Sequence, residues 1–179
     1  LKGNSYKIIQ TLPKFHVLVN PAIKDTQNIG RPKGGLFIAI PDCIKNMVKD
    51  VSPGHWRLQA VIISSPSSKK LLINSYFPTD SRNDNIEEAL EVIDIIKNMI
   101  DTHPCDAVVW AGDLNADFSR HTAHAQLLKE TMEEMNISSA WEKFQADFSY
   151  IRSAASPAPP SSTTSATARV SLTPSVMQE

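Results

Sequence analysis

The chain has 179 residues, of which 41% are hydrophobic and 21% are charged, values typical of a single soluble globular domain. Its formal charge of −1 excludes the strong overall basic character of many nucleic-acid-binding proteins, so a polyanion would have to be held by local groups or by a bound cation. The sequence has two cysteines and no long apolar run, so we expect an intracellular protein with no disulfide framework and no membrane-spanning helix. It does not distinguish a nuclear from a cytoplasmic location.

Short apolar segments rich in Val, Ile and aromatic residues predict β-strands in the first half of the chain, at residues 15–20, 34–40, 58–64 and 71–77. The last two segments are joined by a polar connection of hairpin length, so we expect them to be antiparallel neighbours. Gly34 and Gly35 open the second of the four strands.

Two helices and a further strand are predicted in the second half. Residues 85–101 carry a broad apolar stripe at helical spacing, and His103-Pro104 ends that helix. Residues 106–111 form an uninterrupted apolar strand, which is typical of a strand covered on both faces, and residues 122–135 predict a second helix. Strands and helices in this order indicate an α/β fold with a mixed sheet.

The composition changes sharply after Tyr150. Residues 153–179 are dominated by Ser, Thr, Ala and Pro and contain no aromatic residue, which predicts a disordered tail. The expected organisation is therefore a folded domain over residues 1–152 followed by this tail.

The first candidate for chemistry is the Gly112-Asp113-Leu114-Asn115 step, which directly follows the apolar strand. Ligands of α/β folds bind where strands leave the sheet, and in an extended segment Asp113 and Asn115 would point the same way. The carboxylate could take a proton from water or hold a cation, and the amide could bind a phosphate oxygen. The alternative is an ordinary polar turn, which these residue types also favour.

The second candidate is the end of the preceding strand, where Tyr76 and Pro78 follow Asn74. Asn74 and Tyr76 are two residues apart, so they should share one face of the strand. A phenol in this place can donate a hydrogen bond to a phosphate oxygen, with Asn74 beside it as an orienting group. The alternative is an aromatic side chain that covers the rim of the core.

In this order, these segments resemble the endonuclease/exonuclease/phosphatase superfamily, whose members have a four-layer α/β sandwich of mixed sheets flanked by helices. The Gly-Asp-x-Asn step at Gly112–Asn115 is the most specific motif, supported by the Tyr-x-Pro strand end at Tyr76–Pro78 and the Gly-Gly strand at 34–40. Phe148-Ser149-Tyr150 is similar to a Thr-Tyr or Thr-Trp step of the family. The resemblance spans about residues 10–152 and looks closest to endonuclease domains of non-long-terminal-repeat retrotransposons.

The resemblance implies a Mg²⁺-dependent phosphodiesterase acting on DNA, in a parent protein that could carry a reverse-transcriptase domain. Asp113 would orient or deprotonate the attacking water and could contact the metal, and Asn115 would bind the phosphate and help hold Asp113. Tyr76 would contact the scissile phosphate or the leaving group. Ser149, in place of the usual Thr, would make a lesser contact to the phosphate or orient it.

Two departures from the family pattern predict a truncated and impaired domain. The family's early Asn and its metal-binding Glu have no counterpart before Gly30, and the tail after Ser153 lacks the closing Asp-His pair. A shifted reading frame, a different exon or a decayed element would account for such a tail. A fragment of a sandwich would also expose a sheet edge and apolar surface, which predicts poor solubility.

Three alternatives remain open at this point. The chain could be a phosphatase of the same superfamily that acts on a phosphoester, or a remnant that keeps the fold without catalysis. A separate and weaker possibility is a metal site made by His121 and His124 with Asp117.

Overall fold

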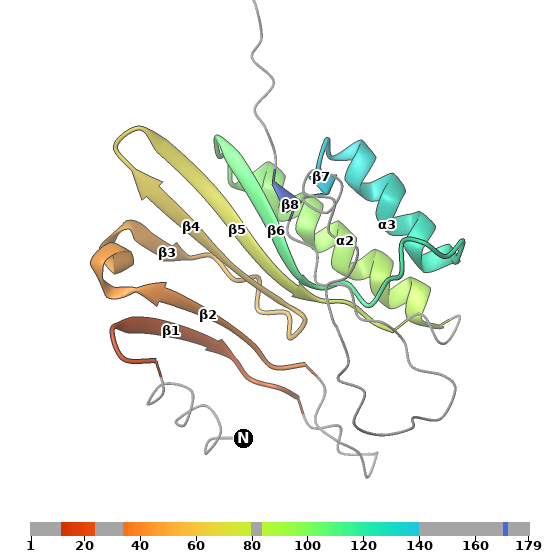
Figure 1. The fold of residues 1–179 in the computed structure, drawn as a ribbon, viewed down its shortest axis with the longest axis horizontal. Helices are drawn as coiled ribbons and strands as arrows, with labels where there is room; N and C mark the ends of the chain where they lie inside the picture. The colour runs from red at the N-terminus through yellow and green to blue at the C-terminus, as the bar shows by residue number, and fades with distance from the viewer. Residues whose placement is uncertain (1–11, 24–33, 80–83, 140–169, 172–179) are drawn as a thin grey trace, which may run out of the picture.

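The computed structural model of this protein describes residues 12–23, 34–79, 84–139 and 170–171 (Figure 1). A two-stranded antiparallel sheet contains β1 (Phe15–Asn20) and β2 (Leu36–Pro41). The larger, mixed sheet has the strand order β3-β4-β5-β6-β8-β7. Its strands are β3 (Val48–Asp50), β4 (Leu58–Ser65), β5 (Ser68–Tyr76), β6 (Ala107–Asp113), β7 (Ser138–Ser139) and β8 (Val170–Ser171). The helical elements are η1 (Asp42–Met47), α2 (Asp84–Thr102) and α3 (Ala123–Glu134).

The strand directions in the centre of the large sheet decide which strand ends share an edge. β4 and β5 form an antiparallel hairpin, whereas β5 and β6 run parallel and are connected through α2. Because parallel strands end at the same edge of a sheet, the last residues of β5 and β6 lie together, and β4 begins at that same edge. This edge carries the candidate site.

The described residues form three layers. One face of the large sheet packs against α2 and α3 around Ile73, Ile93 and Trp110, and this is the main core of the protein. The opposite face packs against the two-stranded sheet through a smaller cluster centred on Ile38, Ile40 and Val61. This arrangement confirms the predicted α/β class, while a helix layer outside the two-stranded sheet is not among the described residues.

Most predicted elements are present, with shifted ends. β5 begins at Ser68 because the hairpin turn is tight, with Ser65 paired to Ser68. β6 extends through Asp113, two residues further than predicted, and its residues are more deeply buried on the helix face than on the other. Two residues of the predicted disordered tail form β8, which pairs with β6. None of the helices within the described ranges is long and apolar enough to cross a membrane.

Gly112 allows β5 and β6 to pair up to their last residues. A Cβ atom at this position would lie 1.9 Å from the carbonyl oxygen of Ser75 and 2.7 Å from its amide nitrogen. The residue also has φ +135°, a conformation that a side chain disfavours. The glycine of the Gly-Asp-x-Asn step is therefore required by backbone contact, independently of any chemistry.

Replacement of Gly112 by Ala should destabilise the fold by about 3 kcal/mol or more, because the new Cβ collides with backbone rather than with a movable side chain. Gly54→Ala is the matched control, since Gly54 also has positive φ (+80°) but a Cβ added there would meet no atom within 4 Å. We expect it to cost only about 1 kcal/mol. Urea unfolding followed by circular dichroism measures both, and equal losses would contradict the packing argument.

The outer face of the two-stranded sheet is apolar and exposed. Phe15, Val19 and Phe37 are 41%, 36% and 45% exposed, and Val19 is the strand partner of Phe37. Because residues alternate along a strand, these side chains share one face, whereas Ile38 and Ile40 point to the core. Such a patch favours self-association, in line with the predicted poor solubility.

The variant Phe37→Thr should raise the soluble fraction of the expressed chain with little change in its melting temperature, because Thr suits a strand and removes exposed apolar area. Ile38→Thr is the control on the same strand, and it should lower the melting temperature because Ile38 is only 7% exposed. Solubility after centrifugation and thermal melts distinguish the two effects. An unchanged soluble fraction in Phe37→Thr would count against the patch as the cause.

Candidate active site at the ends of β5 and β6

Tyr76 and Asp113 are the last residues of neighbouring parallel strands and are direct partners in the sheet register. Paired residues of adjacent strands point to the same face, with their Cβ atoms about 5 Å apart. The structure therefore places the predicted phenol and carboxylate side by side, although they are 37 positions apart in the sequence. Both side chains are partly exposed.

Asn115 does not continue the extended chain. It has φ +47°, and its backbone N–H donates to Oδ1 of Asp113 at 3.0 Å, which closes a tight polar turn. The expectation that Asp113 and Asn115 project in the same direction from an extended segment is therefore wrong. The turn replaces that geometry because the strand ends at Asp113 and the side chain of Asp113 satisfies the following backbone donor.

Hydrogen bonds tie this turn to the end of β5. The backbone N–H of Phe77 donates to the carbonyl oxygen of Asp113 at 2.8 Å, and the Nδ2 of Asn115 donates to the carbonyl oxygen of Phe77 at 2.7 Å. One N–H of the Asn115 amide is used in this way, which leaves its second N–H and its oxygen for other partners. Asp113, Asn115 and Tyr76 thus form one connected unit.

Asn74 lies on the same face of β5 as Tyr76, as predicted, and reaches toward the two-stranded sheet. Its Nδ2 donates to the carbonyl oxygen of Phe37 at 3.2 Å, so the observed contact connects the two sheets. Gln59 is its partner on β4 and is 2% exposed, and its Oε1 has no hydrogen-bond partner among the described residues. Asn74 and Gln59 are therefore two polar side chains on the face of the large sheet that packs against the two-stranded sheet.

Arg57 is a residue of the site that the sequence analysis missed. It is 5% exposed, and its guanidinium donates from Nε to Oε1 of Glu88 and from Nη1 to the carbonyl oxygen of Tyr76, each at 2.9 Å. The same group lies over the ring of Trp56, 4.0 Å from its centroid, and 5.3 Å from that of Tyr76. The sequence signal that could have identified it is an Arg that follows a Trp directly before an apolar strand.

The residues on either side of Arg57 also hold the two-stranded sheet in place. Nδ2 of Asn20, at the end of β1, donates to the carbonyl oxygens of His55 and Leu58 at 3.0 and 2.9 Å. Trp56 covers Gly34 so closely that a Cβ there would lie 2.6 Å from the ring. A glycine at position 34, just before β2, is therefore needed to admit this aromatic side chain.

The electrostatics of the site centre on Asp113. Burial raises the pKa of its carboxyl above the ordinary value of 3.8, and the hydrogen bond from the Asn115 N–H partly offsets that rise. No group of three or more His, Cys, Asp or Glu side chains suited to a metal ion occurs within the described ranges. The described residues therefore do not form a complete Mg²⁺ site around Asp113.

The alternative metal site is not formed. His124 is fully buried against the carbonyl oxygen of Leu114, whereas His121 is exposed. The carboxylate of Asp117 accepts hydrogen bonds from Ser119 and pairs with Arg120 at 3.1 Å, and the Ser119 hydroxyl is the main cause that lowers its pKa. His121 and His124 have the i, i+3 spacing of a helical metal site, but burial of the His124 ring in the core keeps the two rings from sharing a metal.

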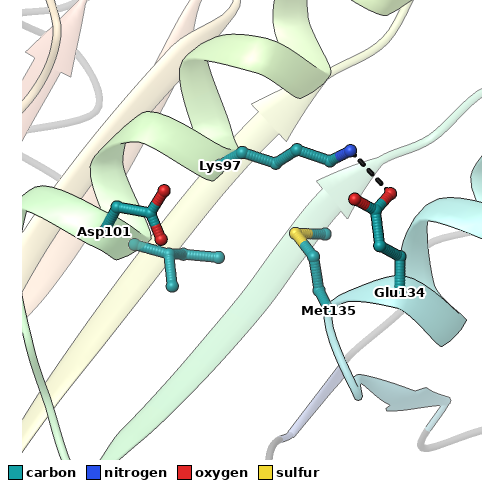
Figure 2. A pocket seen from close by; sticks show the side chains of 5 residues that line it. Lys97, Asp101, Glu134 and Met135 are labelled. Carbon is teal, nitrogen blue, oxygen red and sulfur yellow. Dashed lines mark hydrogen bonds and ion pairs between the residues drawn. The ribbon is translucent and has the colours of Figure 1, made fainter.

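Ser149 falls outside the described residues, so its predicted contact stays a prediction. Figure 2 shows a hollow between the C-terminal ends of α2 and α3, where Lys97 pairs with Glu134 at 2.6 Å near Asp101 and Met135. These helices begin at the edge that carries Tyr76 and end at the opposite edge, so the hollow is remote from the candidate site.

Comparison with solved structures identifies the fold. The chain is similar to the endonuclease domain of TRAS1, a telomere-specific non-LTR retrotransposon, with a TM-score of 0.55 and 18% identity over 88% of this chain. It is similar to AP endonuclease LMAP from Leishmania major, with a TM-score of 0.60 and 14% identity over 96% of this chain. It is also similar to an endonuclease/exonuclease/phosphatase family protein from Leptotrichia buccalis C-1013-b, with a TM-score of 0.54 and 8% identity over 93% of this chain.

The chain has the endonuclease/exonuclease/phosphatase fold. It spans 67%, 66% and 63% of the lengths of these three structures, respectively. No protein-family model matches the sequence, and no curated protein matches it. At these identities the likeness establishes the fold alone, and the function rests on the site.

The raised pKa of Asp113 predicts how its removal changes stability with pH. Below the ordinary carboxyl pKa of 3.8, Asp113 is protonated in both the folded and the unfolded chain and costs nothing. As pH rises through the higher folded-state pKa, ionisation of the partly buried carboxyl destabilises the fold. Asp113→Asn should therefore melt at a higher temperature than the wild type at pH 7, with the difference vanishing near pH 3. A difference that does not depend on pH would contradict this.

Proposed function

We propose that this chain is part of a phosphodiesterase domain that cleaves DNA, of the retrotransposon endonuclease type. The observation that carries the proposal is the convergence of Asp113, Asn115 and Tyr76 at one sheet edge. Two proteins of similar fold, the TRAS1 domain and LMAP, are endonucleases by name. The proposal extends that activity to this chain because its strand ends present a carboxylate, an amide and a phenol together.

Each of the three side chains has a distinct role in this proposal. Asp113 takes or orients the proton of an attacking water. The second N–H of Asn115 and the hydroxyl of Tyr76 donate to oxygens of the scissile phosphate. Arg57 fixes the backbone of Tyr76 and is neutralised by Glu88, so it positions the phenol without adding a free charge to the site.

If the proposed reaction uses Mg²⁺, most ligands of the ion must come from residues outside the described ranges. A divalent ion at a phosphodiester neutralises charge on the phosphate and the leaving oxygen. The described part of the chain offers Asp113 but not a surrounding set of ligands. Because the sequence before Gly30 has no counterpart of the family's metal-binding Glu and the tail after Ser153 lacks the closing Asp-His pair, we infer that the activity of this chain is impaired.

A non-catalytic remnant is the second candidate, and the same lack of a ligand set within the described ranges favours it. A phosphatase with this fold would use the same three side chains on a terminal phosphate. The contacts of the described residues do not distinguish the two substrates, and we place the phosphatase second because the TRAS1 domain and LMAP are endonucleases by name.

Nicking of supercoiled plasmid by the purified chain, in Mg²⁺ and in EDTA, tests the proposal. We expect slow nicking that requires Mg²⁺ and that falls by at least about 100-fold in Asp113→Asn, as typically follows loss of a catalytic proton acceptor. Tyr76→Phe should also reduce the rate, because it removes only the hydroxyl.

Asp117→Asn is the matched control, since Asp117 is an acidic residue nearby in sequence that is already paired with Ser119 and Arg120. Its nicking rate should stay within about twofold of the wild type. Binding of a short DNA duplex without nicking would assign the chain to the remnant. Nicking that is the same in Asp113→Asn as in the wild type would exclude the proposed site.

A further inference from the structure

His124 lies directly behind the Gly112–Asn115 turn. It occupies the first turn of α3, is 0% exposed, and its Nε2 is 3.1 Å from the carbonyl oxygen of Leu114. Leu114 is the residue between Asp113 and Asn115. A carbonyl oxygen can only accept a hydrogen bond, so Nε2 carries the proton and donates it.

The imidazole ring is held in place from two sides. Its edge meets the ring of Phe77, with centroids 6.1 Å apart and planes at 71°, and Phe77 packs in turn on Trp110 at 5.6 Å. On the helix side, Thr122 caps α3 by accepting a hydrogen bond from the backbone N–H of Ala125. The donor that reaches Leu114 is therefore fixed by the core and by the start of α3.

Packing alone does not account for a histidine at this position. With the proton on Nε2, the other ring nitrogen is an acceptor, and Nδ1 is buried without a hydrogen-bond partner among the described residues. A buried acceptor without a partner is destabilising, and an aliphatic side chain would fill the space without that penalty. The contribution specific to histidine is thus the hydrogen bond to Leu114.

That hydrogen bond acts where the backbone is under strain. Asn115 is a non-glycine residue with φ +47°, a conformation that persists when surrounding contacts hold it. Two contacts come from the turn and β5, through Asp113 and Phe77. The third comes from α3, through His124 to the carbonyl that immediately precedes Asn115.

We propose that His124 is a positioning residue for the candidate site, because its Nε2–H holds the Leu114 carbonyl and thereby keeps Asp113 and Asn115 in their joint orientation. The importance of that orientation for catalysis rests on the proposed phosphodiesterase function. The hydrogen bond and its effect on the turn do not, so they can be tested without DNA or metal.

Amide hydrogen exchange by NMR tests the proposal in the purified chain. The readout is the exchange rate of the Asn115 amide, which donates to Asp113, divided by that of Ile73 in the middle of β5. In His124→Leu this ratio should rise about tenfold, the effect of losing one hydrogen bond that holds the turn. In His124→Gln, whose amide can also donate, it should stay within about threefold of the wild type.

Leu128→Ala separates positioning from general destabilisation, because Leu128 is a fully buried residue of the same helix that does not contact the turn by a hydrogen bond. It should accelerate exchange at both amides and leave their ratio unchanged. An unchanged ratio in His124→Leu, or an equal rise in Leu128→Ala, would overturn the proposal.

A measurement on the wild-type chain covers the case in which His124→Leu does not fold. Long-range ¹H–¹⁵N correlation spectra of the imidazole distinguish a protonated from an unprotonated ring nitrogen. We expect Nε2 of His124 to carry a proton. A proton on Nδ1 instead would remove the donor to Leu114 and overturn the proposal.

Discussion

The parallel pairing of β5 with β6, up to their last residues, is the constraint on which both the core and the candidate site depend. It brings Tyr76 beside Asp113 and leaves no room for any side chain at Gly112, whose backbone lies against that of Ser75. The interior of the sheet supports this contact, because the indole of Trp110 donates to the hydroxyl of Ser75 at 2.8 Å. The geometry of the candidate site therefore depends on close backbone contact within the sheet.

The segment from His55 to Leu58 connects the layers of the protein. It accepts hydrogen bonds from the end of β1, covers the glycine before β2, and sends Arg57 to the end of β5 and to α2. Each of these contacts joins parts that are distant in the sequence. A buried guanidinium needs a fixed set of partners, so it specifies one arrangement of helix and strand ends where apolar contacts alone would tolerate several.

The near-neutral charge of the chain agrees with a site built from a few donors. The buried cation Arg57 is paired with Glu88, so the strand ends do not carry an excess of positive charge from it. In the proposed function, a phosphate at this edge would be bound by the amide of Asn115 and the hydroxyl of Tyr76. The described part of the chain thus brings together the side chains of the proposed phosphate site, whereas it contains no set of metal ligands around Asp113.

The sequence by itself determined the α/β class, the β4–β5 hairpin and both helices, because periodicity and turn residues are local signals. It singled out Asp113, Asn115 and Tyr76 as candidate site residues. It also placed Asn74 on the face of Tyr76, which follows from strand alternation alone. Only the tertiary structure decided that Asn115 turns back to the end of β5, that Arg57 supports Tyr76, and that His124 binds a backbone carbonyl and not a metal. Each of these hydrogen bonds joins a donor to an acceptor that is distant in the sequence, and the spacing of residues along the chain does not predict such pairs.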